Sequence, residues 1–281
     1  DTNVVDTASL NKPPADITLT STSISESANS LVVGILGTTD TDQGAGVAFT
    51  YALAEVSGTD YASFSINQAP GALSFTSQPD YETKSSYSVT IIANDVGGKT
   101  FSKTLTVSVT DANDAPTVTN AIADQAIAED SVLNFQFNTN VFSDVDASDT
   151  LAYAATLSNG SALPAWLSFD AATRTFSGTP INGDVGVIAV KVTATDPGSA
   201  TVTDTFNITV TNTNDAPTVA SEIANETIVE DSGLNYFQFD TNIFADVDIG
   251  DTVTYTATLS DGTALPSWLT FNPATRTFSG T

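Results

Sequence analysis

The chain has 281 residues and a formal net charge of -26, from 33 acidic and 7 basic residues. Seven Lys and Arg residues are too few to replace the counterions of nucleic acid or to hold an anionic membrane surface, so neither is expected as a partner. The absence of Cys and His excludes disulfides, Cys/His zinc sites and Cys/His nucleophile pairs among these residues.

The length allows two or three domains of ordinary size. Hydrophobic residues make up 41% of the chain, and Val, Ile, Thr and Phe alternate with polar residues, which favours packed β-strands over acidic disorder. No apolar run approaches the roughly 20 residues of a membrane span, so direct membrane insertion is not expected in this segment. The first residue, Asp1, and the ending at Thr281 lead us to expect a piece of a longer protein.

Residues 1–12 are predicted to be a linker or the tail of a preceding module, and residues 13–114 the first domain. Turn residues separate its short alternating segments about every ten residues, which predicts an all-β sandwich. The predicted strand segments lie at 17–27, 47–56, 61–67, 71–76, 87–95 and 101–110.

An internal repeat follows. Residues 139–179 and 241–281 are identical at roughly two-thirds of their positions, which indicates tandem modules over 115–215 and 216–281. In the first copy the motif FSGT precedes two more strand-like stretches, whereas the second copy has none after it. We therefore expect the 216–281 module to be incomplete, with part of its core and a sheet edge uncovered.

The hexapeptide DANDAP, residues 111–116, returns as NTNDAP at 212–217, each time after a strand-like run. A catalytic motif is needed once, whereas a joint between modules is needed at every junction. The acidic residues gather in short motifs near the predicted strand ends. This pattern indicates an architectural role for the carboxylates.

The motifs of the first domain resemble those of cadherin repeats. Asp40-x-Asp42-x-Gly44 resembles the DxDxG motif, and Pro79-Asp80-Tyr81-Glu82 the LDRE/LDYE motif. Ala93-x-Asp95 resembles AxD, and Asp111-x-Asn113-Asp114 the DxNDNxP linker. The next two modules resemble dystroglycan-type cadherin-like (Ig-like) repeats of bacterial surface proteins, through ALPAWLSFDAATRTFSGTP and the Asp144-x-Asp146 pair. The resemblance covers nearly the whole chain after residue 12.

The resemblance implies calcium at each joint. The first joint would use Glu26, Asp80, Glu82, Asp111 and Asp114, together with Asn113, the Ala115 carbonyl, Asp144, Asp146 and Asp196. The second joint would use Glu129, Asp184, Asn214, Asp215, Asp246 and Asp248. The residues Asp40, Asp42 and Asp95 would serve a joint with an upstream module.

The chain departs from the family pattern in two ways, one at both joints and one at the second joint alone. Ala115 and Ala216 replace the final linker Asn, and Asp184 alone stands where the first domain has Asp80-x-Glu82. We therefore expect the first joint to bind calcium more tightly. The chemistry agrees with calcium, because the ion takes six to eight oxygen ligands and reverses the repulsion among crowded carboxylates.

The predicted fold is all-β: tandem Ig-like and cadherin-like Greek-key sandwiches in an elongated rod, with the last module truncated. The predicted role is a calcium-rigidified extender or adhesion segment of an outer-membrane-associated or secreted bacterial adhesin, outside the cell. Like rods, through homophilic adhesion, and surface glycans are further candidate partners. The alternative is a polysaccharide-binding array attached to a carbohydrate-active enzyme. Trp166 and Trp268 are expected in cores, and no enzymatic activity is expected because the acids recur in every module.

Overall fold

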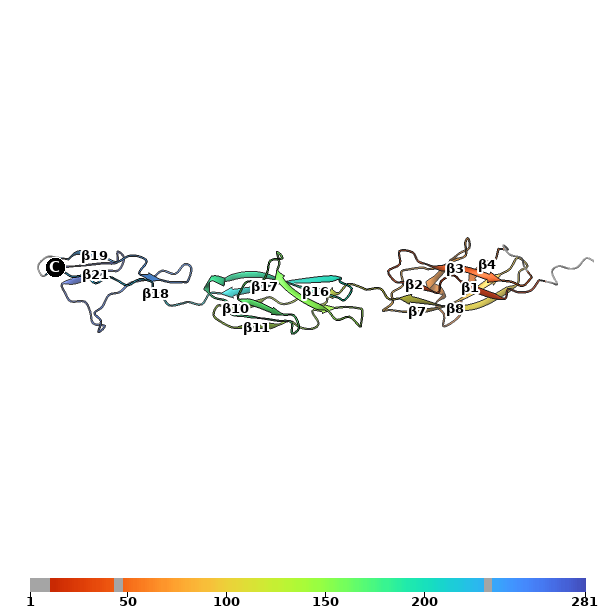
Figure 1. The fold of residues 1–281 in the computed structure, drawn as a ribbon, viewed down its shortest axis with the longest axis horizontal. Coiled ribbons are helices and arrows are strands. Elements are labelled where there is room, and N and C mark those ends of the chain that lie inside the picture. Colours follow the sequence, from red (N-terminus) through yellow and green to blue (C-terminus); the bar gives the residue numbers. More distant parts are fainter. Residues whose placement is uncertain (1–10, 43–47, 230–233) are drawn as a thin grey trace, which may run out of the picture. The chain divides into compact units, whose positions relative to one another are not determined.

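The computed structural model describes residues 11–42, 48–229 and 234–281. Their regular structure consists of β-strands and two single-turn 3-10 helices, η2 (Tyr61–Ser63) and η3 (Asn182–Asp184) (Figure 1). The predicted all-β fold of tandem sandwiches is confirmed, whereas the domain limits given above stay predictions. Residue contacts divide the chain into two compact units, and each is described by itself.

The first unit contains a sandwich of two four-stranded sheets, ordered β1-β3-β6-β5 and β2-β8-β7-β4. The loops Asp144–Thr150 and Pro197–Ala200 also belong to this unit. Its strands are β1 (Asp16–Leu19), β2 (Ser23–Ser25), β3 (Val32–Thr39), β4 (Thr50–Leu53), β5 (Phe64–Asn67), β6 (Ala72–Phe75), β7 (Ser86–Asn94) and β8 (Thr100–Thr110).

Alternation along β7 and β8 places their apolar side chains in the core between the two sheets. Val89 and Ile91 of β7 and Val107 of β8 are fully buried. Thr90, on the opposite face of β7 from Val89 and Ile91, is buried as well, and its hydroxyl is satisfied by a hydrogen bond with the Thr104 hydroxyl across the strand pair at 2.8 Å. The period-two pattern therefore gives the strand and its core face correctly.

The second unit begins with a sandwich of one four-stranded sheet, β10-β17-β16-β13, and one three-stranded sheet, β11-β15-β14. The short pair β9-β12 adjoins it. Its strands are β9 (Thr117–Val118), β10 (Gln125–Ala128), β11 (Leu133–Gln136), β12 (Phe142–Ser143), β13 (Ala152–Leu157), β14 (Leu167–Asp170), β15 (Thr175–Gly178), β16 (Gly186–Thr195) and β17 (Thr201–Thr211).

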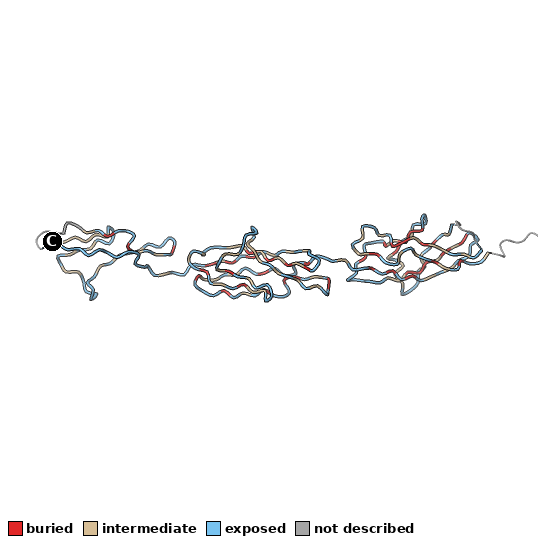
Figure 2. The backbone as a smooth tube through the Cα atoms, in the orientation of Figure 1, coloured by how far each residue is buried: buried red, intermediate tan, exposed pale blue. Residues whose placement is uncertain are grey.

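In residues 216–281, here called the third repeat, the described residues form part of such a sandwich. The three-stranded sheet returns as β19-β22-β21 and the short pair as β18-β20. The strands are β18 (Thr218–Val219), β19 (Leu234–Gln238), β20 (Phe244–Ala245), β21 (Leu269–Asn272) and β22 (Thr277–Gly280). Figure 2 shows the consequence: buried red segments run through the second sandwich, whereas the described part of the third repeat is mostly exposed or intermediate.

One topological feature recurs in both closed sandwiches and positions the acidic residues. The early strand β2 pairs in parallel with the last strand β8, with Ser25 opposite Thr110. In the second sandwich β10 pairs in parallel with β17, with Ala128 opposite Thr211. Because parallel partners end at the same sheet edge, the residue after each early strand leaves the sheet beside the linker.

Candidate metal centres

Glu26 and Glu129 follow the two early strands and occupy the same place in their sandwiches. The backbone N–H of Glu26 donates to the Thr110 carbonyl at 3.2 Å, and that of Glu129 to the Thr211 carbonyl at 3.0 Å. These bonds extend each parallel pairing by one step. They direct both carboxylates toward the linker that follows the last strand.

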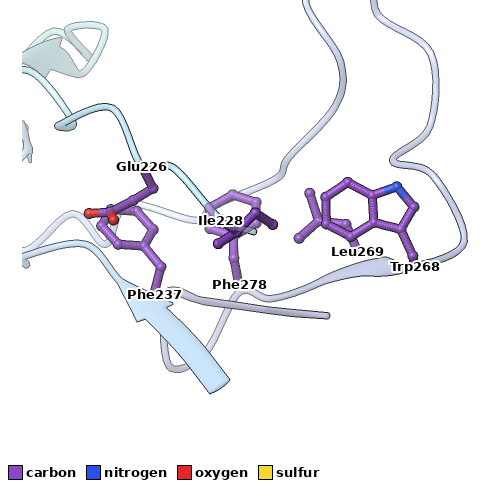
Figure 3. Close-up of a pocket in the computed structure, with 6 residues that line it drawn as sticks. All are labelled: Glu226, Ile228, Phe237, Trp268, Leu269 and Phe278. Carbon is purple, nitrogen blue, oxygen red and sulfur yellow. The ribbon is translucent and has the colours of Figure 1, made fainter. Parts of the chain in front are cut away.

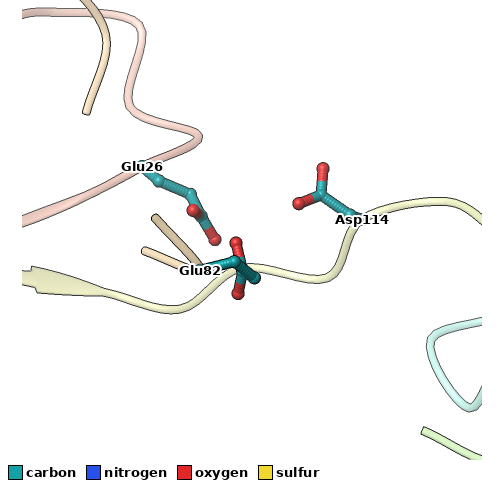
Figure 4. A group of neighbouring side chains, drawn as sticks. All are labelled: Glu26, Glu82 and Asp114. Carbon is teal, nitrogen blue, oxygen red and sulfur yellow. The ribbon is translucent and has the colours of Figure 1, made fainter. Parts of the chain in front are cut away.

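The first acidic cluster consists of Glu26, Glu82, Asp111, Asp114 and Asp146, all in the first unit. One oxygen from each of Glu26, Glu82 and Asp114 lies within 4.8 Å of the others, and Figure 4 shows the three side chains converging. A second group, which shares Glu82 with the first, consists of Glu82, Asp111 and Asp146, and one oxygen of each also lies within 4.8 Å of the others. The structure thus brings together five of the residues predicted for the first joint.

Backbone amides hold two of these carboxylates. Glu26 accepts the Ala112 N–H on Oε1 at 2.7 Å and the Tyr81 N–H on Oε2 at 2.6 Å. Asp146 Oδ2 accepts the Asp114 N–H at 2.9 Å. The linker backbone is therefore fixed by the acidic side chains that surround it.

Crowding affects the protonation of this cluster. Burial raises the pKa of Glu82, and the carboxylates of Glu26, Asp111 and Asp146 raise it further. The pKa of Asp114 is raised by burial first, and then by the carboxylates of Glu26 and Asp146. Both shifts mean that the local environment disfavours another negative charge, the condition that a bound cation would relieve.

The second acidic cluster is built by the same rules in the second unit. One oxygen each of Glu129, Asp215 and Asp248 lies within 4.8 Å of the others, and Asp246, Asp248 and Asp251 form an adjoining group. Glu129 Oε1 accepts the Thr213 N–H at 2.8 Å, and Asp248 Oδ2 accepts the Asp215 N–H at 2.6 Å. These two bonds match the linker bonds of Glu26 and Asp146, whereas Glu129 Oε2 has no counterpart of the Tyr81 N–H that Glu26 Oε2 accepts.

Two buried oxygens in these clusters have no hydrogen-bond partner. Glu129 is 2% exposed and its Oε2 is unpaired, and Asp146 is 8% exposed with an unpaired Oδ1. Leaving a buried polar atom unpaired costs about 1–3 kcal/mol. Each oxygen points to a missing cationic partner, and hard carboxylate oxygens are the ligands that calcium prefers. The donor set therefore fits calcium.

Some predicted ligands lie outside these groups. Asp80 accepts the Thr83 N–H and hydroxyl, both at 2.9 Å, and the N–H bond is the main cause of its lowered pKa. Asp184 accepts the Ile181 N–H at 3.0 Å and so closes the turn of η3. Asp196 is buried. Asp144 Oδ1 accepts the Asp146 N–H at 3.2 Å, and the Asp144 carboxylate contributes to the raised pKa of Asp114 in the first cluster.

The linker asparagines serve the linker backbone. The side-chain amide of Asn113 donates to the Asp114 carbonyl at 2.9 Å, and that of Asn214 to the Asp215 carbonyl at 2.8 Å. Asn113 also fits closely against Gly198, where an added Cβ would lie 1.9 Å from its Oδ1. This contact explains why glycine stands in the loop after Asp196.

The upstream acidic cluster contains Asp40, Asp42 and Asp95. Asp40 Oδ1 accepts the Asp42 N–H at 3.2 Å, as in the other two DxD pairs. Sharing a hydrogen bond with Asp42 raises the pKa of Asp40 and lowers that of Asp42. Asp42 Oδ2 also accepts the Lys12 N–H at 2.8 Å. Gly44 of the predicted DxDxG motif lies outside the described residues.

Sequence reasoning missed four participants in these sites, one of which is Asp251, the acid that adjoins Asp246 and Asp248. Asn11 and Lys12 stand where Asn113 and Asp114 stand in the first linker, since Asn11 contacts Asp95 and fits against Gly97. Aligning NKPP with NDAP is the signal that identifies them. Asn182, whose amide donates to Asp248 Oδ1 at 3.1 Å, gave no such signal because only folding brings η3 to this cluster.

Among the described residues, no helix has the length and apolar character needed to cross a membrane.

Residues 20–110 match the Cadherin domain family, and residues 115–211 and 216–281 match the Putative Ig domain family. The protocadherin-like wing polarity protein stan of Drosophila melanogaster is 35% identical over 105 residues, which make up 35% of this chain and 3% of that protein. The chain thus spans a small part of its curated relative.

Solved structures with a similar fold are cadherin ectodomains. Human protocadherin-24 EC1-2 superposes with a TM-score of 0.55 at 18% identity, covering 72% of this chain and 100% of that one. Protocadherin gammaB7 EC3-6, in its cis-dimer structure, gives 0.51 at 19% identity, covering 96% and 69%. At these identities the likeness establishes the fold alone. The chain belongs to the Putative Ig domain family over residues 115–211 and 216–281, and residues 20–110 are a cadherin domain that precedes them.

Proposed function

We propose that this chain is a calcium-binding, calcium-rigidified extender and adhesion segment of a bacterial cell-surface or secreted adhesin. The observation that carries the proposal is the repeated geometry of the two acidic clusters. In each, one Glu accepts a linker N–H and one Asp of a DxD pair accepts another. In each, a buried carboxylate oxygen has no partner.

Calcium supplies a physical reason for such an arrangement. Carboxylates that lie within 4.8 Å of one another repel. The chain has only 7 Lys and Arg residues against 33 acids, so few basic side chains can offset this repulsion. A divalent cation would convert the repulsion into attraction and tie each linker to the sheet ends around it. Removing the ion would loosen the joint. Calcium concentration would then control the stiffness of the chain.

The adhesive role rests on the kind of domain present. Cadherin and Ig-like repeats occur in extracellular adhesion proteins, and the third repeat continues the same architecture. The bacterial surface is proposed because residues 115–281 resemble Ig-like repeats of bacterial surface proteins. The polysaccharide-binding alternative calls for an exposed aromatic strip. Trp166 is half-buried against the core of the second sandwich, whereas Trp268 (Figure 3) is 45% exposed, so the prediction that Trp268 is a core residue is wrong for the described structure.

Calorimetric titration with calcium tests the proposal on the full chain after exhaustive chelation. We expect saturable binding that weakens in Asp114→Asn for the first cluster and in Asp215→Asn for the second. Glu55→Gln and Glu222→Gln are matched controls, because both remove one charge from an exposed acid outside the clusters. Equal weakening in all four variants would show only a general charge effect.

Small-angle scattering tests the mechanical part separately. We expect the maximum dimension to become longer and better defined in calcium than in chelator. Calcium binding without any change in scattering would retain the metal sites but refute rigidification. No binding by calorimetry would refute both.

A further inference from the structure

The two acidic clusters follow one plan but differ in the loop that each sandwich brings to the linker. In the first unit this loop connects β6 to β7 and carries Glu82 (Figure 4). The corresponding loop of the second unit connects β15 to β16 and carries Asn182. The first residue of the repeated hexapeptide changes in the same direction, from Asp111 to Asn212. Two acids of the first cluster are therefore matched by two neutral amides in the second.

Three carboxylates meet at this position in the first cluster. One oxygen from each of Glu82, Asp111 and Asp146 lies within 4.8 Å of the others. Asp146 Oδ2 accepts the Asp114 N–H at 2.9 Å, but its Oδ1 is buried and has no hydrogen-bond partner. Three negative charges and an oxygen without a donor are the conditions that a bound cation relieves.

In the second cluster a side-chain amide occupies this position. Asp248, the counterpart of Asp146, also uses Oδ2 to accept a linker N–H, that of Asp215, at 2.6 Å. Its Oδ1 accepts an N–H of the Asn182 amide at 3.1 Å, and the other N–H can reach Asn212 Oδ1, which lies 3.4 Å from Asn182 Nδ2. Asp248 is 5% exposed, so the amide satisfies a buried oxygen that stays unpaired in Asp146.

The unpaired oxygen of the second cluster lies elsewhere, on Glu129. Glu26 Oε2 accepts the Tyr81 N–H at 2.6 Å, whereas Glu129 Oε2 is buried without a partner. One oxygen of Glu129 also lies within 4.8 Å of oxygens of Asp215 and Asp248. The second cluster therefore lacks a cationic partner beside Glu129 and not beside Asn182.

We propose that the Asn182 amide takes the place of one cation in the second cluster, so that Asp248 stays tied to η3 without calcium. This inference rests on the proposed calcium function. The first cluster would bind an ion among Glu82, Asp111 and Asp146 that has no equivalent in the second, where the ion lies at Glu129. Loss of calcium would then loosen the first linker more than the second.

The local charge explains why a neutral donor is sufficient at Asn182. Among Asn182, Asn212 and Asp248 only the last carries a charge, so little repulsion remains for an ion to relieve. Calcium takes six to eight oxygen ligands, whereas Asn182 presents N–H groups to this position. An amide donor also keeps its bond at any calcium concentration, as a bound ion cannot.

Hydrogen exchange of the full chain in chelator tests the amide bond in the absence of calcium. The Asp215 amide is the probe, because its acceptor Asp248 is held by Asn182. We expect Asn182→Ala to speed exchange of this amide about tenfold, as for the loss of one hydrogen bond to a charged group, and to leave the Asp114 amide unchanged. Asn225→Ala, at an exposed position outside the clusters, is the matched control. Equal exchange in wild type and Asn182→Ala would overturn the proposal.

Asn182→Asp tests the substitution of amide for cation through a change of sign. The variant keeps the size of the side chain and replaces the donor by a carboxylate beside Asp248. We expect faster exchange of the Asp215 amide than in Asn182→Ala in chelator, and recovery in calcium because the new carboxylate can share an ion. An equal loss in chelator and in calcium would show that no cation can occupy this position, and the proposal would be wrong.

Calorimetric titration with calcium separates the remaining reading, in which Asn182 binds calcium through Oδ1. Asn182→Ala should bind as many ions as wild type, with affinities within about threefold. Loss of an ion, or binding about tenfold weaker, would make Asn182 a ligand and overturn the proposal. A wild-type chain that binds no calcium would instead refute the proposed function, while the exchange rates in chelator would still show whether Asn182 holds Asp248.

Discussion

Glu129→Gln removes one negative charge from the second acidic cluster and keeps a hydrogen-bond acceptor in place. The amide oxygen can still accept the Thr213 N–H, which Glu129 Oε1 accepts at 2.8 Å. The new amide group replaces Oε2, the buried oxygen that lacks a partner. It can donate to the carboxylates of Asp215 and Asp248, each of which has one oxygen within 4.8 Å of an oxygen of Glu129.

The structure sets the size and sign of the effect. Two charges at the 4.8 Å limit within which these oxygens lie repel by about 3.5 kcal/mol at an effective dielectric constant of 20. Solvent around half-buried Asp215 reduces this figure, and relief of the unpaired oxygen adds about 1–3 kcal/mol. We expect the calcium-free free energy of unfolding to rise by about 2 kcal/mol, or roughly 10 °C in melting temperature for a domain of this size. In calcium the sign reverses, because the variant loses a charged ligand and at least about tenfold in affinity.

Scanning calorimetry of the full chain in chelator and in saturating calcium measures both effects. Glu222→Gln, an exposed acid outside the clusters, is the control for the change in net charge. A variant that is destabilised in chelator, with an unchanged response to calcium, would refute the reasoning. Glu129 would then be a structural acceptor and nothing more.

Three further predictions concern the first unit and the central strand β15 of the three-stranded sheet in the second unit. The raised pKa values of Glu82 and Asp114 mean that both acids stabilise the calcium-free fold when protonated, and that this stability is lost as pH rises through the raised values. The melting temperature in chelator should therefore increase as pH falls from neutral toward the ordinary carboxyl range, with a smaller increase in Glu82→Gln; an unchanged slope would contradict the assignment. Lys12→Asp adds a carboxylate to the upstream cluster, so thermal melts should show destabilisation in chelator that calcium reduces, and an equal loss in both conditions would argue against a cation site. Gly178→Ala places a Cβ 1.8 Å from the Trp166 carbonyl oxygen and should cost about 3 kcal/mol in urea unfolding, whereas a neutral effect would show that the strand can shift.

The sequence alone determined the strands and the modular plan. Alternation along residues 87–95 and 101–110 predicts β7 and β8, because a strand with one buried face must repeat every two residues. The copy of residues 139–179 at 241–281 predicts a repeated sheet, because the same local pattern folds in the same way. The candidate ligands were also within reach, since Glu26, Asp114 and Asp146 belong to short motifs whose order along the chain can be read directly.

Only the tertiary structure decided which oxygens meet. Asp80 and Glu82 are equivalent by spacing, yet Asp80 is held by Thr83 and only Glu82 joins the first cluster. Asp184, one of the acids predicted for the second joint, accepts the Ile181 N–H in the turn of η3, and Asn182 of the same turn donates to Asp248. In such loops, local backbone amides compete with the cluster for each carboxylate, and sequence spacing does not fix the direction of the side chain. The parallel pairings that bring Glu26 and Glu129 to their linkers join residues more than eighty positions apart, so only folding could place them there.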